Sequence, residues 1–176
     1  FCSASNFNKF KGLSLLLEVV RYFSVRRNPS VLPVKFVVIG EVSKSAASLL
    51  HHLNVEMLGR VTRMESLEKL RECDVFLQVS CWDLTSTVLC EAVSCGAVPI
   101  ALDTNEFSTV VKNGDNGFLI NSLENQSLAK QIAQKIELLR RDRKLLEAMS
   151  NANIAIWKEN LSKESLNRSL CECIAK

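Results

Sequence analysis

The chain has 176 residues, 47% of them hydrophobic, which is enough for one domain with a substantial buried core. Its net charge is only +3 and its lysines and arginines form no basic block, so the sequence does not indicate a nucleic-acid-binding protein. The longest apolar runs fall well short of the ~20 residues that a transmembrane helix needs, so no membrane span is expected.

The first part of the chain alternates apolar runs with helical patterns. Leu13, Leu16 and Val20 recur at helical spacing, Pro29 follows the end of that pattern, and Ser43 is a suitable N-cap for the next helix. In chain order, we expect a strand at 1–5, a helix at 11–27, a strand at 34–39, a helix at 43–53, a strand at 55–58 and a helix at 64–73.

A strand–helix–strand unit follows. A buried strand at 75–79 leads through a polar loop to a helix that opens at Thr85–Ser86, and a second apolar strand follows at 97–102. Such a crossover is right-handed almost without exception, so the loop and the first helical turn should lie at the carboxyl edge of a parallel sheet, where α/β proteins bind ligands. Two carboxylates, those of Asp83 and Glu91, are expected at this edge.

The last part of the chain changes in character. A short helix at 107–112, turn residues at 113–117 and a strand at 118–120 complete the alternating pattern. Amphipathic helices are then expected at 128–139 and 145–157, with a final segment at 161–175. The predicted fold is a Rossmann-like parallel sheet with helices on both faces, with an α/β core at about 1–122 and carboxyl-terminal helices at 123–176.

The seven cysteines are an odd number and are scattered among core-type residues, which favours free thiols in a reducing compartment, the cytoplasm. Cys171-x-Cys173 has no second pair and no nearby histidine, so a zinc site is not predicted. His51 and His52 are adjacent and would point in different directions on a helix, so we interpret them as a polar helix end.

The stretch that begins at Asp83 resembles a known family. Seven residues separate Asp83 from Glu91, and the segment Ala92-Val-Ser-Cys-Gly-Ala-Val-Pro99 follows. This pattern is similar to that of nucleotide-sugar glycosyltransferases of the B fold, especially the retaining family 4. Further landmarks in family order are Lys11-Gly12, Phe36-Val-Val-Ile-Gly40, Val55-Glu-Met-Leu-Gly-Arg-Val61, Cys73-Asp-Val-Phe76 and Val110-Val-Lys-Asn-Gly-Asp-Asn-Gly-Phe-Leu119.

The resemblance covers the carboxyl-terminal, donor-binding half of such an enzyme. It implies that residues 1–176 form a single nucleotide-sugar-binding domain whose partner, an amino-terminal acceptor domain, lies outside this chain. The implied ligand is a UDP- or GDP-sugar, and neither a metal nor another cofactor is expected. The full-length protein would then act in the cytoplasm or on the cytosolic face of a membrane.

The resemblance also implies roles for single residues. Glu91 would accept hydrogen bonds from both ribose hydroxyls, since a carboxylate offers two acceptor oxygens. Thr85, Ser86 and Thr87 would present free backbone N–H groups to the diphosphate at the start of their helix, and Lys11 would supply a positive charge.

The remaining implied roles concern the sugar and the base. Asp83 stands where the family's first acid contacts the transferred sugar. The backbone near Gly40 and Val61 would meet the nucleobase, although a glycine at the end of a strand is also an ordinary turn residue.

Three departures from the family pattern keep an alternative open. The usual arginine is missing at Ser5 and Asn6, and the first acid is Asp83 where glutamate is usual. The segment Asp103-Thr-Asn-Glu-Phe-Ser-Thr109 stands where the family usually has a glycine pair and then a glutamate. These changes favour, as the alternative, a catalytically impaired relative that serves as a scaffold or nucleotide-binding interaction module. A dinucleotide-binding domain is not indicated because no Gly-x-Gly-x-x-Gly follows the early strands.

Overall fold

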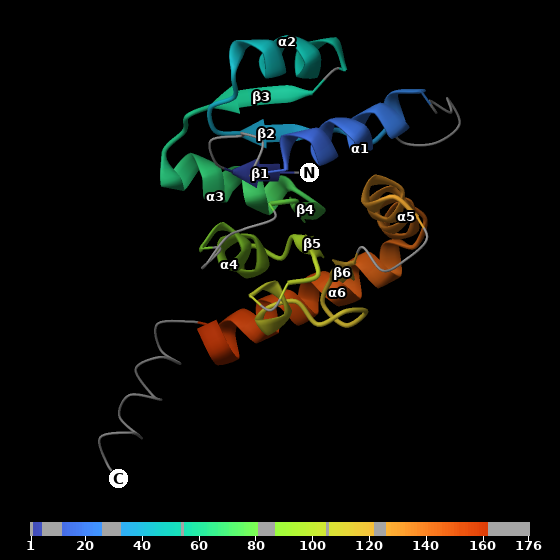
Figure 1. Cartoon of the computed structure of the whole chain (residues 1–176). Coiled ribbons are helices and arrows are strands. Elements are labelled where there is room, and N and C mark those ends of the chain that lie inside the picture. The colour runs from blue at the N-terminus through green and yellow to red at the C-terminus, as the bar shows by residue number, and fades with distance from the viewer. Residues whose placement is uncertain are drawn as a thin grey trace.

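The computed structural model describes residues 2–4, 12–25, 33–53, 55–80, 87–104, 106–121 and 126–161. Within them the chain forms one parallel sheet flanked by helices (Figure 1). The strands are β1 (Cys2–Ala4), β2 (Val37–Ile39), β3 (Glu56–Gly59), β4 (Val75–Gln78), β5 (Val98–Leu102) and β6 (Phe118–Ile120). The helices are α1 (Leu13–Val25), α2 (Lys44–His52), α3 (Arg63–Glu72), α4 (Thr87–Ser94), the 3₁₀ helix η2 (Phe107–Thr109), α5 (Leu128–Arg141), α6 (Arg143–Ile156) and the π-helical turn η3 (Trp157–Leu161).

The strand order is β3-β2-β1-β4-β5-β6, and each described pair of neighbours is parallel. The chain therefore builds the sheet outward from β1 in one direction, and then returns to place β4 on the other side of β1 (Figure 1). The predicted Rossmann-like fold class is confirmed. In such a sheet, the point where the strand order reverses is where ligands bind, here between the carboxyl ends of β1 and β4.

Each face of the sheet is covered by its own apolar cluster. One joins alternate strand residues such as Leu77 and Ile100 to α1, α2 and α5, and it includes Ile132 of α5. The other joins Phe76 and Ala101 to α3, α4 and η2. Because side chains alternate along a strand, a strand buried on both faces must be apolar throughout, which explains why β5 is buried at every position.

Helix α6 crosses the amino edge of β5 and β6, where a buried pair of asparagines fastens it. The Asn153 amide donates to the carbonyl oxygens of Ala97 (3.3 Å) and Asn116 (2.9 Å) and accepts from Asn116 Nδ2 (2.9 Å). Asn116 also accepts from the Lys112 N–H (2.6 Å) and donates to the Val110 carbonyl (3.0 Å). Both asparagines are fully buried, so these bonds are not exchanged with water.

Replacing Asn153 with alanine should destabilise the protein by about 2–3 kcal/mol, because two backbone carbonyls and one amide lose a buried partner. The exposed Asn151 on the same helix is the matched control, and its replacement should change the free energy of unfolding by less than about 0.5 kcal/mol. Urea denaturation measures both values. Equal effects would show that the buried network adds nothing.

The predicted elements that fall within the described residues are all present, with two informative differences in length. Strand β2 is assigned only from Val37, which lies opposite Cys2 of β1, whereas a strand from Val34 was predicted. The helix predicted at 107–112 is only a 3₁₀ turn, because the Asn116 side chain hydrogen-bonds the Val110 carbonyl and the Lys112 N–H. The segment predicted at 161–175 lies, apart from its first residue, outside the described residues.

None of the described helices combines the length and the apolar character of a membrane span.

Candidate functional site

Helices α1 and α4 leave the carboxyl edge of the sheet toward opposite faces. Helix α1 follows β1 and packs into the first apolar cluster, whereas α4 follows β4 and packs into the second. Since β1 and β4 are neighbours, these two helices follow the two strands that meet at the reversal point of the strand order. The predicted ligand-binding edge is therefore the edge that the topology favours.

Gly12 brings the start of α1 against the end of β4. Its φ angle is +77°, and a Cβ atom at this position would lie 2.0 Å from the Val79 carbonyl oxygen. The backbone at the start of α1 is thus in direct contact with the end of β4, an approach that only glycine allows. In the sequence, Lys11 directly precedes Gly12, and residues 81–86 follow Ser80.

Four of the predicted site residues, Lys11, Asp83, Thr85 and Ser86, lie outside the described residues. Thr87 is described, and it is the exposed first residue of α4.

Glu91 lies one turn inside α4 and faces the start of α3. Its carboxylate Oε1 accepts a hydrogen bond from Arg63 Nε at 2.8 Å. The Glu91 side chain is 20% exposed and that of Arg63 is 78% exposed. The carboxylate is therefore partly buried but accessible to solvent. Helices α3 and α4 begin after the carboxyl ends of β3 and β4, so this ion pair lies at the predicted edge.

Gly40 and Val61 lie farther along the same edge. The Gly40 N–H donates to the carbonyl oxygen of Gly59 (2.7 Å), which joins the ends of β2 and β3. Val61 is half-buried against the apolar cluster of α3 and α4. Glu41 and Arg60, the neighbours of Gly40 and Val61 in the sequence, form an exposed ion pair at 3.5 Å. The structure thus brings Gly40, Val61 and Glu91 to one edge of the sheet.

Sequence reasoning missed Arg63. The predicted helix began at Met64, one residue late. A signal for the true start is present in Thr62-x-x-Glu65, a capping box in which the Thr62 N–H donates to Glu65 Oε2 at 2.7 Å and the Glu65 N–H donates to Thr62 Oγ1 at 3.3 Å. The Thr62 N–H and the Thr62 hydroxyl both donate to the Glu65 carboxylate, and these two hydrogen bonds hold the pKa of that carboxyl below its usual range.

Cys90 adjoins Glu91 on α4. Burial raises the pKa of the Cys90 thiol, and the negative charge of Glu91 raises this pKa further. The thiols of Cys90 and Cys95 are free, as the sequence predicted, and half-buried.

At about pH 8, we expect iodoacetamide to alkylate Cys90 more slowly than it alkylates glutathione, because a raised pKa leaves a smaller thiolate fraction. Glu91→Gln should speed the reaction by removing the adjacent negative charge. Peptide mass spectrometry over time measures both rates. Alkylation of Cys90 as fast as that of glutathione would contradict the expectation.

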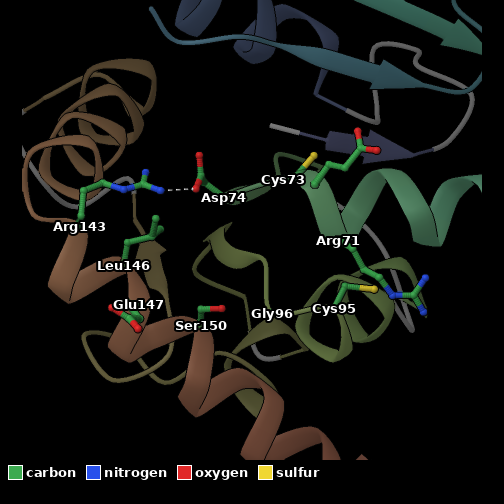
Figure 2. Close-up of a pocket in the computed structure, with 10 residues that line it drawn as sticks. Arg71, Cys73, Asp74, Cys95, Gly96, Arg143, Leu146, Glu147 and Ser150 are labelled. Atoms are coloured by element: carbon green, nitrogen blue, oxygen red, sulfur yellow. Dashed lines mark hydrogen bonds and ion pairs between the residues drawn. The ribbon is translucent and has the colours of Figure 1, made fainter. Parts of the chain in front are cut away.

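A separate hollow of about 380 Å³ lies at the opposite, amino edge of the sheet (Figure 2). Cys73 and Asp74 before β4, Gly96 before β5 and the first half of α6 line it, and Arg143 of α6 binds Asp74 at 2.8 Å. Its lining mixes both signs of charge and includes none of the predicted site residues. Within the described ranges, no cluster of three His, Cys, Asp or Glu side chains is placed to hold a metal ion.

Comparison with known proteins adds an independent result. The model of a family described as "Glycosyl transferases group 1" matches residues 1–155. A search of curated proteins found no match.

Several solved structures share this fold. The carboxyl-terminal domain of the group 1 glycosyl transferase LpcC from Francisella tularensis has a TM-score of 0.75 and 18% identity, with 92% of this chain and 85% of that domain covered. HepE from Anabaena, solved with UDP and glucose, has a TM-score of 0.69 and 21% identity, with 97% and 47% covered. The pneumococcal O-GlcNAc transferase GtfA, solved with UDP and GlcNAc, has a TM-score of 0.75 and 21% identity, with 98% and 35% covered. The chain therefore spans about half or less of the length of HepE and GtfA.

Proposed function

Since the chain belongs to the group 1 glycosyl transferases, we propose that it is the donor-binding part of a retaining enzyme that transfers a sugar from a nucleotide-sugar to an acceptor. The acceptor-binding part would be supplied by an amino-terminal domain outside this chain, as the partial coverage of the longer similar structures suggests. The free thiols support a cytoplasmic location for the donor-binding part.

The observation that carries the proposal is the placement of Glu91. Its carboxylate lies at the carboxyl edge beside the reversal point of the strand order, half-sheltered yet reached by solvent. In our proposal its oxygens accept hydrogen bonds from the two ribose hydroxyls. Hydrogen bonds to a charged group contribute about 1.5–3 kcal/mol each, so this contact would supply a large share of the nucleotide affinity.

The other parts of the nucleotide-sugar are assigned along the same edge. The diphosphate would face the backbone N–H groups of Thr85, Ser86 and Thr87, where the positive end of the α4 dipole lies. Lys11 would reach it from the start of α1, which the contact of Gly12 with Val79 holds beside β4.

The base and the sugar would extend away from this point on either side. The backbone near Gly40 and Val61, at the ends of β2 and β3, would contact the nucleobase. Asp83 would contact the transferred sugar. In transfer with retention, the leaving nucleoside diphosphate gains negative charge, so the cation of Lys11 and the α4 amides would stabilise it without a metal ion.

A second function, that of an impaired relative acting as a nucleotide-binding scaffold, is favoured by the loop after β5. The family's glycine pair is replaced there by residues with side chains, and Thr104 Oγ1 accepts a hydrogen bond from the Phe107 N–H at 3.4 Å. Side chains in this loop would obstruct a close approach of the sugar to the backbone. Binding of the nucleotide without transfer of the sugar is the expected behaviour of such a module.

Calorimetric titration of the chain with UDP, GDP and ADP tests donor binding, with and without EDTA. UDP is tested first because HepE and GtfA were solved with UDP. We expect binding that EDTA does not change, and absence of binding for all three nucleotides would refute the proposal. The full-length protein, assayed for release of nucleoside diphosphate from a panel of nucleotide-sugars, separates the enzyme from the scaffold.

A further inference from the structure

Arg63 and Glu91 meet across the two helices that begin at the carboxyl edge. Arg63 is the first residue of α3, and Glu91 lies one turn inside α4. Their contact runs through the single Nε–H of the guanidinium, which donates to Oε1 at 2.8 Å. Within the described part of the chain, Glu91 Oε2 takes no part in this ion pair. One oxygen of the carboxylate is thus engaged by Arg63, and the ion pair leaves the other oxygen unused.

The start of α3 is held firmly enough to make this contact reproducible. The capping box of Thr62 and Glu65 fixes the first turn of α3. Helices α3 and α4 share one apolar cluster, and the Cys95 thiol at the end of α4 donates to the Leu67 carbonyl of α3 at 3.7 Å. The backbone positions of Arg63 and Glu91 are therefore set by packing and capping and do not depend on the ion pair itself.

We infer that Arg63 is a positioning residue of the nucleotide site, which holds the Glu91 carboxylate in the orientation that receives the ribose hydroxyls. This inference rests on the proposed function. A glutamate side chain has three rotatable bonds, and ordering them when the nucleotide binds costs conformational entropy. Arg63 orders the carboxylate beforehand. A carboxylate offers about four lone-pair sites, so one bond from Arg63 leaves enough acceptors for two hydroxyls.

A masking role for Arg63 predicts the opposite change in nucleotide affinity. If Arg63 masked Glu91 until a nucleotide displaced it, removal of the guanidinium would tighten binding. If it positions Glu91, removal weakens binding, by about two- to fivefold for an ion pair this exposed. The sign of the change in affinity therefore decides between positioning and masking.

The experiment is a double-mutant cycle read by calorimetry with two ligands, UDP and 2′,3′-dideoxy-UDP. The variants are Arg63→Ala, Arg63→Lys, Glu91→Ala and the double variant of Arg63→Ala with Glu91→Ala. Arg71→Ala is the matched control, because Arg71 is an exposed arginine of the same helix at the opposite edge of the sheet. The ratio of the two affinities isolates the hydroxyl contact, because charge effects on the diphosphate act equally on both ligands.

We expect Arg63→Ala to weaken UDP binding about two- to fivefold and to leave the dideoxy ligand unchanged. Arg63→Lys should restore part of the loss, and Arg63→Ala should have no effect once Glu91 is alanine. Arg71→Ala should change neither affinity. Unchanged or tighter UDP binding by Arg63→Ala, with Glu91→Ala still weakening it, would overturn this inference alone. UDP binding that is absent or indifferent to Glu91→Ala would overturn the proposed function and the inference together.

Discussion

Replacing Glu91 with alanine should weaken UDP binding by roughly 10- to 100-fold, the largest effect on affinity that we expect from any single side chain of this edge. Two charge-assisted hydrogen bonds of about 1.5–3 kcal/mol each would be lost, and water that takes the place of the carboxylate and hydrogen-bonds the ribose hydroxyls offsets part of that loss. Calorimetric titration at fixed ionic strength measures the change.

Two further variants separate the role of the Glu91 carboxylate from general charge effects. Glu91→Gln keeps one acceptor oxygen and the size of the side chain, so its affinity for UDP should lie between that of the wild type and that of Glu91→Ala. Glu72→Ala removes the same charge from an exposed site at the far end of α3 and should leave UDP affinity unchanged. Equal losses from Glu91→Ala and Glu72→Ala would mean that net charge, and not a ribose contact, sets the affinity.

Gly12→Ala should be the most destabilising single substitution considered, at roughly 3–5 kcal/mol. The new Cβ would lie 2.0 Å from the Val79 carbonyl oxygen, and the φ angle of +77° strains any residue with a side chain. Helix α1 would have to move away from β4, and Lys11 would move with it. Chemical denaturation measures the loss of stability. Calorimetry should show that the variant protein that remains folded binds UDP more weakly.

Gly114→Ala separates the clash from the backbone strain. Gly114 has a similar φ angle of +89°, but a Cβ atom there meets nothing within 4 Å. Its replacement should therefore cost only the strain of a left-handed residue, roughly 1–2 kcal/mol. A comparable cost for the two substitutions would mean that the Gly12–Val79 contact relaxes easily and does not position Lys11.

Local sequence patterns predicted most of the fold. Continuous apolar runs predicted the buried strands, because β4 and β5 are covered on both faces and tolerate few polar residues. Ser43 was correctly predicted as the N-cap of α2, because capping depends on a hydroxyl and the next few backbone N–H groups. His51 and His52 are, as predicted, exposed at the end of this helix.

Features that depend on residues distant in the chain were not predicted. The bond between Asn116 and Asn153 joins residues 37 positions apart, and its consequence, a shortened helix after Phe107, could not be read from local spacing. The ion pair of Arg63 with Glu91 joins residues 28 positions apart. Such contacts depend on how α3 packs beside α4, and a single sequence does not specify that packing.

The candidate site likewise combines features that the sequence predicted with features that only the structure shows. The position of Glu91 on a helix at the carboxyl edge followed from the strand–helix–strand pattern, and the structure places it there. Its partner Arg63 and the close approach of Gly12 to Val79 appear only in three dimensions. The roles of Asp83 and Lys11, which lie outside the described residues, stay predictions from the family resemblance.

A crystal structure of the chain with UDP tests most directly whether Glu91 binds the ribose. We predict that the nucleotide lies along the carboxyl edge, with both ribose hydroxyls within hydrogen-bonding distance of the Glu91 carboxylate and Arg63 Nε still on Oε1. A nucleotide seated in the hollow beside Asp74 and Arg143, or one at the carboxyl edge whose ribose does not touch Glu91, would contradict that role.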